Sequence, residues 1–191
     1  MTPLQLTEVE ALELLAQQYG LTGQLSALPG ERDHNFQLCL ANGEKNTFKL
    51  VSADVPLESL KVEIQAMQHL TSVLGNLVPQ PLVDQAGNFI SQGNLLNGSS
   101  CWLRLQSWQP GIPLAEFRPH TTELFHSVGH LMGKVATLLS TLAVPDPHPD
   151  LPWHPDQASQ IVEEGLSLVA DPLLKNFLEQ ALQLYLSLIH I

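Results

Sequence analysis

The clearest helical pattern in the sequence, residues 56–74, lies between two groups of strand-like segments. Its apolar side chains recur along one helical face, and Gly75 follows directly as a C-terminal stop. Strand patterns cover residues 24–28, 35–41, 47–51, 89–91 and 101–108. The Asn42-Gly43 pair indicates a hairpin between the second and third of these strands. A helix inserted into hairpin-linked strands predicts an antiparallel sheet rather than alternating β-α-β units.

Only helical patterns follow the breaker Pro110-Gly111-Ile112-Pro113, which marks a candidate hinge. They cover residues 121–142, 156–169 and 172–185. A further short helix over residues 7–19 begins at Thr7, a residue that caps helices well, and ends before Gly20. The sequence therefore predicts an α+β fold, with a sheet-containing part followed by a mainly helical part.

The net charge of −11 argues against nucleic acid or an anionic membrane surface as the main partner. Cys39 and Cys101 lie in apolar strand patterns without metal-ligand spacing, so two free thiols in a reducing compartment are expected. No basic segment followed by an apolar core begins the chain, and no apolar run has the length of a membrane span. These features favour a cytoplasmic protein.

Lys49 and Glu63 are the residues that point to chemistry. Lys49 lies in the middle of a strand pattern, where a solvated or snorkelling lysine is the simple alternative. Glu63 projects within or beside the apolar face of the helix, although a rim position with its carboxylate in water is also open. A carboxylate in an apolar face is costly unless it is paired. Lys49, the one lysine in a core-like strand, is therefore its expected partner.

Two backbone segments extend this pattern, while the histidines do not. Gly30 precedes the second strand, although a single glycine there also fits an ordinary turn. The strand at residues 101–108 runs into a Pro-Gly break, where a kinase-like hinge offers backbone groups to adenine and a plain strand exit is the alternative. His126 and His130 are four residues apart, but no glutamate follows His126, so we expect no metal site.

The sequence resembles the aminoglycoside phosphotransferase (choline kinase-like) superfamily, near hydroxylysine kinase and the kinase domains fused to class III aminotransferases. The resemblance covers about residues 12–185, and Glu-Arg-Asp-x-Asn-Phe is its most specific element. The matching stretches are Gly30-Glu31-Arg32-Asp33-His34-Asn35-Phe36, Thr47-Phe48-Lys49-Leu50, the Glu63 helix, Leu77-Val78-Pro79-Gln80-Pro81-Leu82, the hinge at residues 103–111, the helix at residues 128–142, and Pro152-Trp153-His154.

This resemblance implies a protein-kinase-like nucleotide-binding lobe over residues 1–109, with a five-stranded antiparallel sheet and one packed helix. The first helices of a helical lobe would follow over residues 110–185. ATP and Mg²⁺ are the implied cofactors, with Lys49 on the ATP phosphates and Glu63 orienting Lys49. The resemblance also places Gly30, Arg32, Asp33 and Asn35 over the phosphates, and Gln106, Ser107 and Trp108 around adenine.

The family transfers the γ-phosphoryl group of ATP to a hydroxyl of a small, often amine-bearing molecule. A small hydroxylated amine or amino acid is therefore the implied second substrate, and a fused aminotransferase domain downstream is an implied neighbour. The family's His-Gly-Asp-x-x-x-x-Asn stretch, which supplies the catalytic base and a metal ligand, is absent from this sequence, as is its later metal-binding Asp. We therefore expect no catalytic residue, no Mg²⁺ ligand and no turnover in this chain.

The last six residues, 186–191, resemble the translation of a transposon-end sequencing adapter, although an ordinary apolar helix end is the alternative. A C-terminally truncated fragment with native sequence ending near Tyr185 is the resulting expectation. Two other readings stay open. One is a non-catalytic nucleotide-binding or interaction module, and the other is an unrelated α+β domain in which Lys49 and Glu63 do not meet.

Overall fold

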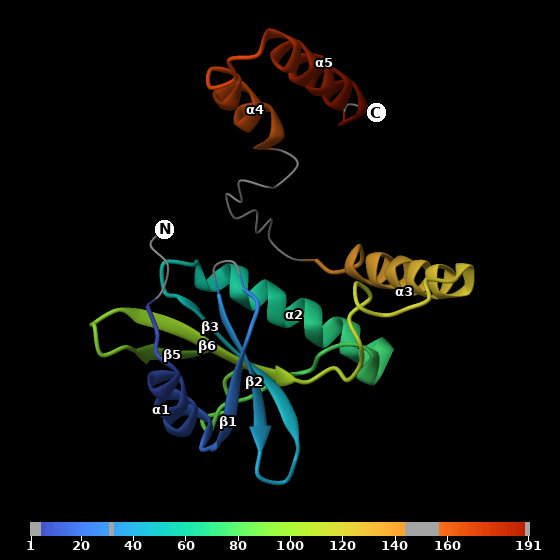
Figure 1. Cartoon of the computed structure of the whole chain (residues 1–191). Coiled ribbons are helices and arrows are strands. Elements are labelled where there is room, and N and C mark those ends of the chain that lie inside the picture. The colour runs from blue at the N-terminus through green and yellow to red at the C-terminus, as the bar shows by residue number, and fades with distance from the viewer. Residues whose placement is uncertain (1–4, 31–32, 144–156, 190–191) are drawn as a thin grey trace. The chain divides into compact units, whose positions relative to one another are not determined.

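The computed structural model describes residues 5–30, 33–143 and 157–189. The chain divides into two compact units, Met1–Pro147 and His148–Ile191 (Figure 1). The expected boundary between two lobes at residue 109 is not tested by this division and stays a prediction.

The first unit has the α+β composition that the order of sequence patterns predicted. A sheet and two flanking helices precede the Pro-Gly segment, and one further helix follows it (Figure 1). The elements in chain order are α1 (Glu8–Tyr19), β1 (Gly23–Leu28), β2 (His34–Leu40), β3 (Lys45–Ser52), α2 (Leu57–Leu74), the 3-10 turn η1 (Gly75–Leu77), β4 (Pro81–Leu82), β5 (Ser91–Asn94), β6 (Ser100–Ser107) and α3 (Thr122–Leu139).

The described residues form a six-stranded antiparallel sheet rather than the expected five-stranded one. Its order is β1-β2-β3-β6-β4, and β5 also pairs with β6. The additional strand, β4, has only two residues and begins with a proline, so it carries no alternating pattern. β5 (Ser91–Asn94) overlaps the expected residues 89–91 only at Ser91 and extends further toward the C-terminus. Gly93 packs closely in it: a Cβ atom there would come 2.8 Å from Leu14 and 2.9 Å from Leu103.

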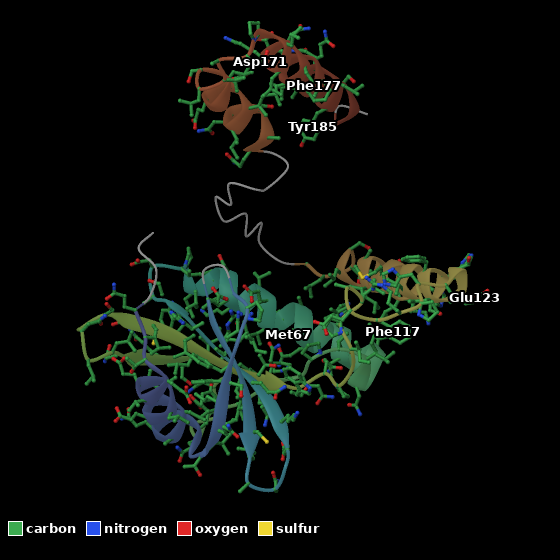
Figure 2. The ribbon with its side chains drawn as sticks, in the orientation of Figure 1. Met67, Phe117, Glu123, Asp171, Phe177 and Tyr185 are labelled. Atoms are coloured by element: carbon green, nitrogen blue, oxygen red, sulfur yellow. The ribbon has the colours of Figure 1, made fainter. Side chains whose placement is uncertain are left out.

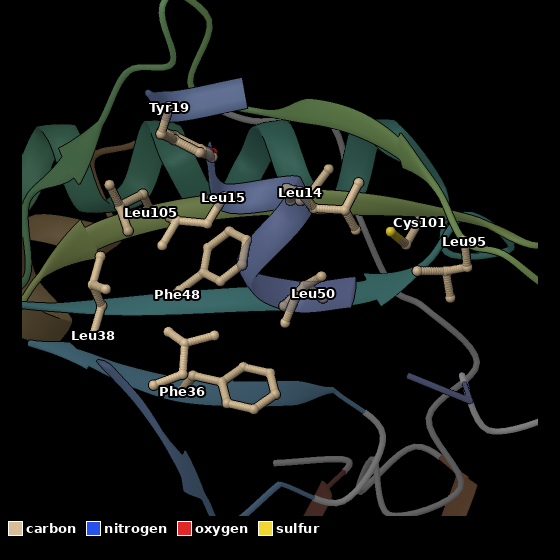
Figure 3. Packing of buried hydrophobic residues seen from close by; sticks show 13 residues of the cluster. Leu14, Leu15, Tyr19, Phe36, Leu38, Phe48, Leu50, Leu95, Cys101 and Leu105 are labelled. Atoms are coloured by element: carbon tan, nitrogen blue, oxygen red, sulfur yellow. The ribbon is translucent and has the colours of Figure 1, made fainter. Parts of the chain in front are cut away.

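One face of the sheet carries the hydrophobic core and is covered by α1 (Figure 3). Phe36, Phe48 and Leu105 are partners in register across β2, β3 and β6, so their side chains share this face. Leu15 of α1 is fully buried against them. This burial of apolar surface is the main stabilising contribution to the first unit.

The opposite face of the sheet is covered by α2. Asn35, Lys49 and Arg104 are partners in register across β2, β3 and β6. Each lies one residue from a member of the buried row Phe36, Phe48 and Leu105. Because side chains alternate along a strand, they point away from α1. Leu60 and Ile64 of α2 are buried. The amphipathic pattern predicted α2 to within one residue at its start, and Gly75 lies at its C-terminal cap as expected.

The second unit is a pair of helices, α4 (Ala158–Leu166) and α5 (Pro172–Ile189), which contact each other. Leu182 on α5 is buried, and Figure 2 marks Phe177 and Tyr185 on the same helix. The helix continues past residue 185, while the origin of residues 186–191 is untested. The matched stretch Pro152-Trp153-His154 lies outside the described residues. No helix in the described parts of the chain is both long and apolar enough to cross a membrane.

Candidate functional site

The strand register gathers polar side chains on the α2 face of the sheet. Lys49 lies opposite Asn35 on one side and Arg104 on the other. Gln106, two residues beyond Arg104 on β6, pairs with Thr47 and so belongs to the same face. The three central strands thus bring together residues that are up to 71 positions apart in the sequence, from Asn35 to Gln106.

Arg104 is the buried cation of this face. Only 3% of the residue is exposed to solvent. Its Nη1 atom donates a hydrogen bond to Oε2 of Glu63, and its Nη2 atom lies 3.7 Å from Oδ2 of Asp33. Its Nε atom is buried and has no hydrogen-bond partner among the described residues. Two carboxylates therefore compensate one buried guanidinium, which a buried charge requires.

The structure pairs Glu63 with Arg104, where the sequence argument paired it with Lys49. Between Lys49 and Glu63 themselves, both described, there is no ion pair. Lys49 Nζ instead lies 3.8 Å from Oδ2 of Asp33, and its side chain keeps 26% of its surface exposed. The physical reason for the difference is burial: the arginine is removed from water almost completely and has the greater need of a counter-charge.

Arg104 was not predicted as the partner of Glu63, because only a lysine was expected there. The signal was present, since one arginine interrupts an apolar strand between Leu103 and Leu105. An arginine there is rarely buried unless it is paired. Lys49 and Glu63 nevertheless belong to one cluster on one face, joined through Asp33 and Arg104, which argues against an unrelated domain that keeps them apart.

The loop before β2 approaches this cluster closely, and Gly30 makes that approach feasible. A Cβ atom at Gly30 would lie 2.3 Å from the backbone oxygen of Asp33 and 2.7 Å from Nδ2 of Asn35. Asn35 Nδ2 donates a hydrogen bond of 3.4 Å to the oxygen of Pro29, while its Oδ1 is buried without a partner in the described residues. Arg32, the remaining loop residue expected at the site, lies outside the described residues.

The end of β6 is held by the segment that precedes β4. The backbone N–H of Ser107 donates to the oxygen of Gln80 at 2.9 Å, and the N–H of Gln80 donates to Oγ of Ser107 at 2.9 Å. Trp108 follows directly and is half-buried. Gln106 therefore joins the charged face, whereas Ser107 and Trp108 mark the exit of the strand toward α3. Figure 2 marks Met67 on α2 and Phe117 in the connection before α3.

Groups with strongly raised pKa values lie near the opposite, α1 side of the sheet. Burial raises the pKa of Tyr19 to about 12 and that of Cys101 to about 11. Both groups are therefore uncharged near neutral pH and are poor candidates for acid–base chemistry. Among the described residues, no group of three or more His, Cys, Asp or Glu side chains could hold a metal ion.

The strand, helix and loop geometry can be compared with known proteins. No family model matches the sequence, and no curated protein matches it closely enough to count as a relative. A solved structure of amicoumacin kinase hAmiN, in complex with AMP-PNP, Ca²⁺ and Ami, is similar with a TM-score of 0.67 and 17% identity. That match covers 93% of this chain and 54% of the other.

A microcompartment-associated aminopropanol kinase is similar with a TM-score of 0.59 and 11% identity, over 77% of this chain and 45% of the other. The chain thus spans about half the length of the two kinases, 54% and 45%. At 17% and 11% sequence identity, this likeness shows the fold alone. The chain has the kinase-like fold that its resemblance to the aminoglycoside phosphotransferase superfamily implied.

Proposed function

We propose that this chain forms the nucleotide-binding part of an ATP-dependent small-molecule phosphotransferase. The observation that carries the proposal is the state of Lys49. Its ammonium group stands on the α2 face, is partly exposed, and has no hydrogen-bond acceptor among the described residues, only a carboxylate oxygen 3.8 Å away. A lysine in this position of a kinase-like sheet is suited to a phosphate oxygen.

The residues present fit a nucleotide better than they fit a metal ion. Lys49 offers a cation that is only loosely paired, with Asp33 at 3.8 Å, and the close loop at Gly30 with Asp33 and Asn35 lies beside it. We propose that Arg32 also binds the ATP phosphates. Gln106, Ser107 and Trp108 would surround the adenine. Amicoumacin kinase was solved with AMP-PNP and Ca²⁺, which supports ATP and a divalent ion as cofactors. The described residues hold no group of three or more His, Cys, Asp or Glu side chains for a metal ion, so the ATP phosphates would supply part of any Mg²⁺ coordination.

We propose that ATP supplies its γ-phosphoryl group to a hydroxyl of a small, amine-bearing metabolite. The negative net charge of −11 favours a cationic acceptor, although only through long-range attraction. A base and metal ligands are needed for that transfer. Since the sequence lacks the His-Gly-Asp-x-x-x-x-Asn stretch, this chain alone is expected to bind nucleotide without turning it over. Two free cysteines and ATP as a substrate fit a cytoplasmic setting.

Calorimetric titration of the 191-residue chain with AMP-PNP and Mg²⁺ tests the proposal. Replacing a lysine that contacts phosphate removes a charge-assisted hydrogen bond, so Lys49→Met should weaken binding by about 10- to 100-fold. Lys45→Met is the matched control, because Lys45 is an exposed lysine on the same strand and should not matter. Binding that is absent in the unmodified chain, or equal in both variants, contradicts the proposal.

The absent catalytic stretch also favours a second candidate, a non-catalytic nucleotide-binding module. The two candidates differ in what happens when the downstream segments of a longer reading frame are supplied. Transfer of ³²P from ATP to a small amino alcohol by an extended protein, lost in Lys49→Met, supports the phosphotransferase. Unchanged nucleotide binding without any transfer supports the module.

A further inference from the structure

We propose that Arg104 is the positioning residue that holds the α2 carboxylate of Glu63, which leaves the Lys49 ammonium free for a nucleotide phosphate. The inference rests on the proposed nucleotide site and adds a residue to it. In the arrangement implied by the family resemblance, one lysine both contacts phosphate and pairs with the helix glutamate. In this structure Glu63 pairs with Arg104 and not with Lys49.

The two members of the Arg104–Glu63 pair differ greatly in burial. The Arg104 side chain is 4% exposed, whereas the Glu63 side chain is 53% exposed. A guanidinium enclosed by the sheet has few alternative positions, while a half-solvated carboxylate can take several. Arg104 is therefore the fixed member of the pair, and Glu63 is the member whose position it determines.

Arginine is the residue type that suits this position. Its guanidinium keeps its charge when buried and can address two carboxylates with separate N–H groups. Here Nη1 bonds to Glu63, and Nη2 approaches Asp33 at 3.7 Å. Arg104 thereby links helix α2 to the loop before β2, the two segments that border Lys49.

The charges of the cluster also favour this division of tasks. Arg104 and Lys49 face Glu63 and Asp33, so the four groups are neutral in sum. A nucleotide adds negative charge and needs a cation whose partner is weakly held. Lys49 meets Asp33 only at 3.8 Å, beyond hydrogen-bond distance, and is more exposed than Arg104. Lys49 can therefore turn to a phosphate while Arg104 stays bound to Glu63.

A double-mutant cycle on the 191-residue chain tests which cation holds Glu63, without any ligand. The cycle combines Arg104→Met with Glu63→Gln, and a parallel cycle combines Lys49→Met with Glu63→Gln. We expect the first pair to be coupled by at least about threefold in the unfolding equilibrium constant, and the second by less than about twofold. The reverse order of coupling would overturn the inference.

Loss of a buried arginine can prevent folding, so the cycle is repeated with Arg104→Lys, which keeps the charge but loses the second N–H direction. Glu63→Gln lies on the surface side of the pair and is expected to fold. Both arginine variants can fail to fold while Glu63→Gln, Lys49→Met and their double variant all fold. If the effects of Glu63→Gln and Lys49→Met on stability are then additive, the Arg104 assignment still stands. Coupling of Glu63 to Lys49 in that set refutes it.

Nucleotide affinity provides the readout that a merely structural role would not move. With folded protein and AMP-PNP, Arg104→Lys and Glu63→Gln should each weaken binding by about three- to tenfold, and the double variant should be no weaker than the worse single variant. Glu58→Gln, an exposed glutamate on the same helix, is the control. Additive losses contradict the inference. A chain that binds no AMP-PNP contradicts the proposed function, while the ligand-free cycle still decides the Arg104 assignment.

Discussion

Arg104 Nη1 donates a hydrogen bond to Glu63 Oε2, and this bond joins β6 to helix α2. β6 pairs with β3, β4 and β5, so it is the strand with the most neighbours in the sheet order. The hydrogen bond thus anchors α2 to β6, the strand with the most neighbours in the sheet. Any ligand that lies on this face meets a helix whose carboxylate is already engaged.

Replacing Asp33 by asparagine should raise nucleotide affinity. The Asp33 carboxylate lies 3.8 Å from the Lys49 ammonium group, where it competes with an incoming phosphate for that cation. Like charges about 4 Å apart repel by about 1 kcal/mol in water, so we expect about fivefold tighter binding of AMP-PNP by calorimetry. Asp54→Asn, an exposed aspartate beyond β3, should leave affinity unchanged. Weaker binding by Asp33→Asn would mean that Asp33 contributes favourably to the bound state.

Adding one methyl group at Gly30 should disturb the loop that carries Asp33. The new Cβ would lie 2.3 Å from a backbone oxygen, which cannot turn away as a flexible side chain can. Overpacking of this kind costs about 1–3 kcal/mol, so the urea midpoint of Gly30→Ala should fall. Gly129→Ala is the matched control: nothing lies within 4 Å of its added Cβ on α3, and alanine is the better helix former. A midpoint of Gly30→Ala equal to that of the unmodified chain would show that the loop has another conformation in solution.

Sequence patterns predicted those elements whose signals are local. α2 begins one residue from its predicted start and ends at its predicted end, because its apolar stripe and Gly75 are both contained in the segment itself. The β2–β3 hairpin follows from Asn42-Gly43, and Gly43 has the positive φ of 83° of the glycine that ends a three-residue hairpin loop. The α+β class follows from the order of these elements along the chain.

Features that depend on strand register were not predictable in the same way. The pairing of Lys49 with Arg104 across β3 and β6 joins residues that are separated by α2, β4 and β5, and no turn residue fixes it. Without that register, Arg104 could not be placed beside Glu63. The two-residue strand β4 is likewise held by its backbone bonds to β6 rather than by its own sequence. The nucleotide role of Lys49 stays a prediction, as do those of Gly30 and of Gln106 to Trp108.

Glu10 should make the first unit sensitive to acid. Hydrogen bonds from the backbone and hydroxyl of Thr7, and from the backbone of Leu96, lower its pKa below the ordinary glutamate value. A group whose pKa is lower in the folded state stabilises the protein above its unfolded pKa, about 4.3, and loses that contribution as pH falls through the folded pKa. The urea midpoints of Glu10→Gln and the unmodified chain should therefore differ most at about pH 7, and the difference should shrink as the pH falls below about 4.3.

Glu13→Gln, an exposed glutamate on the same helix, is the control for Glu10. Loss of the Glu10 carboxylate should destabilise α1 and the β5–β6 hairpin together. Oε1 of Glu10 accepts a hydrogen bond from the N–H of Leu96 at 3.0 Å, while Oε2 caps the helix. A difference that stays constant from neutral to acid pH would show that the carboxylate charge is not involved.

The two cysteines should react at very different rates, and this difference gives a probe of the sheet. Cys101 is fully buried on β6, and burial raises the pKa of its thiol to about 11. The thiolate is the reactive species, and at about pH 8 only about 0.1% of Cys101 is in that form, even before solvent access is considered. Cys39 is half-buried on β2. An aromatic disulfide reagent should therefore label Cys39 quickly and Cys101 slowly, and Cys39→Ser should remove the fast phase.

The slow phase is informative because Cys101 shares β6 with Arg104. Labelling of Cys101 requires the strand to open, so its rate reports the population of the opened sheet. A ligand that binds only the closed form must lower that population, although it lies on the other face. At about 100 times its dissociation constant, AMP-PNP should slow Cys101 labelling by about 100-fold if opening abolishes the site. Labelling that is fast at Cys101, or that is unaffected by a nucleotide shown to bind, would mean that β6 opens without loss of the site.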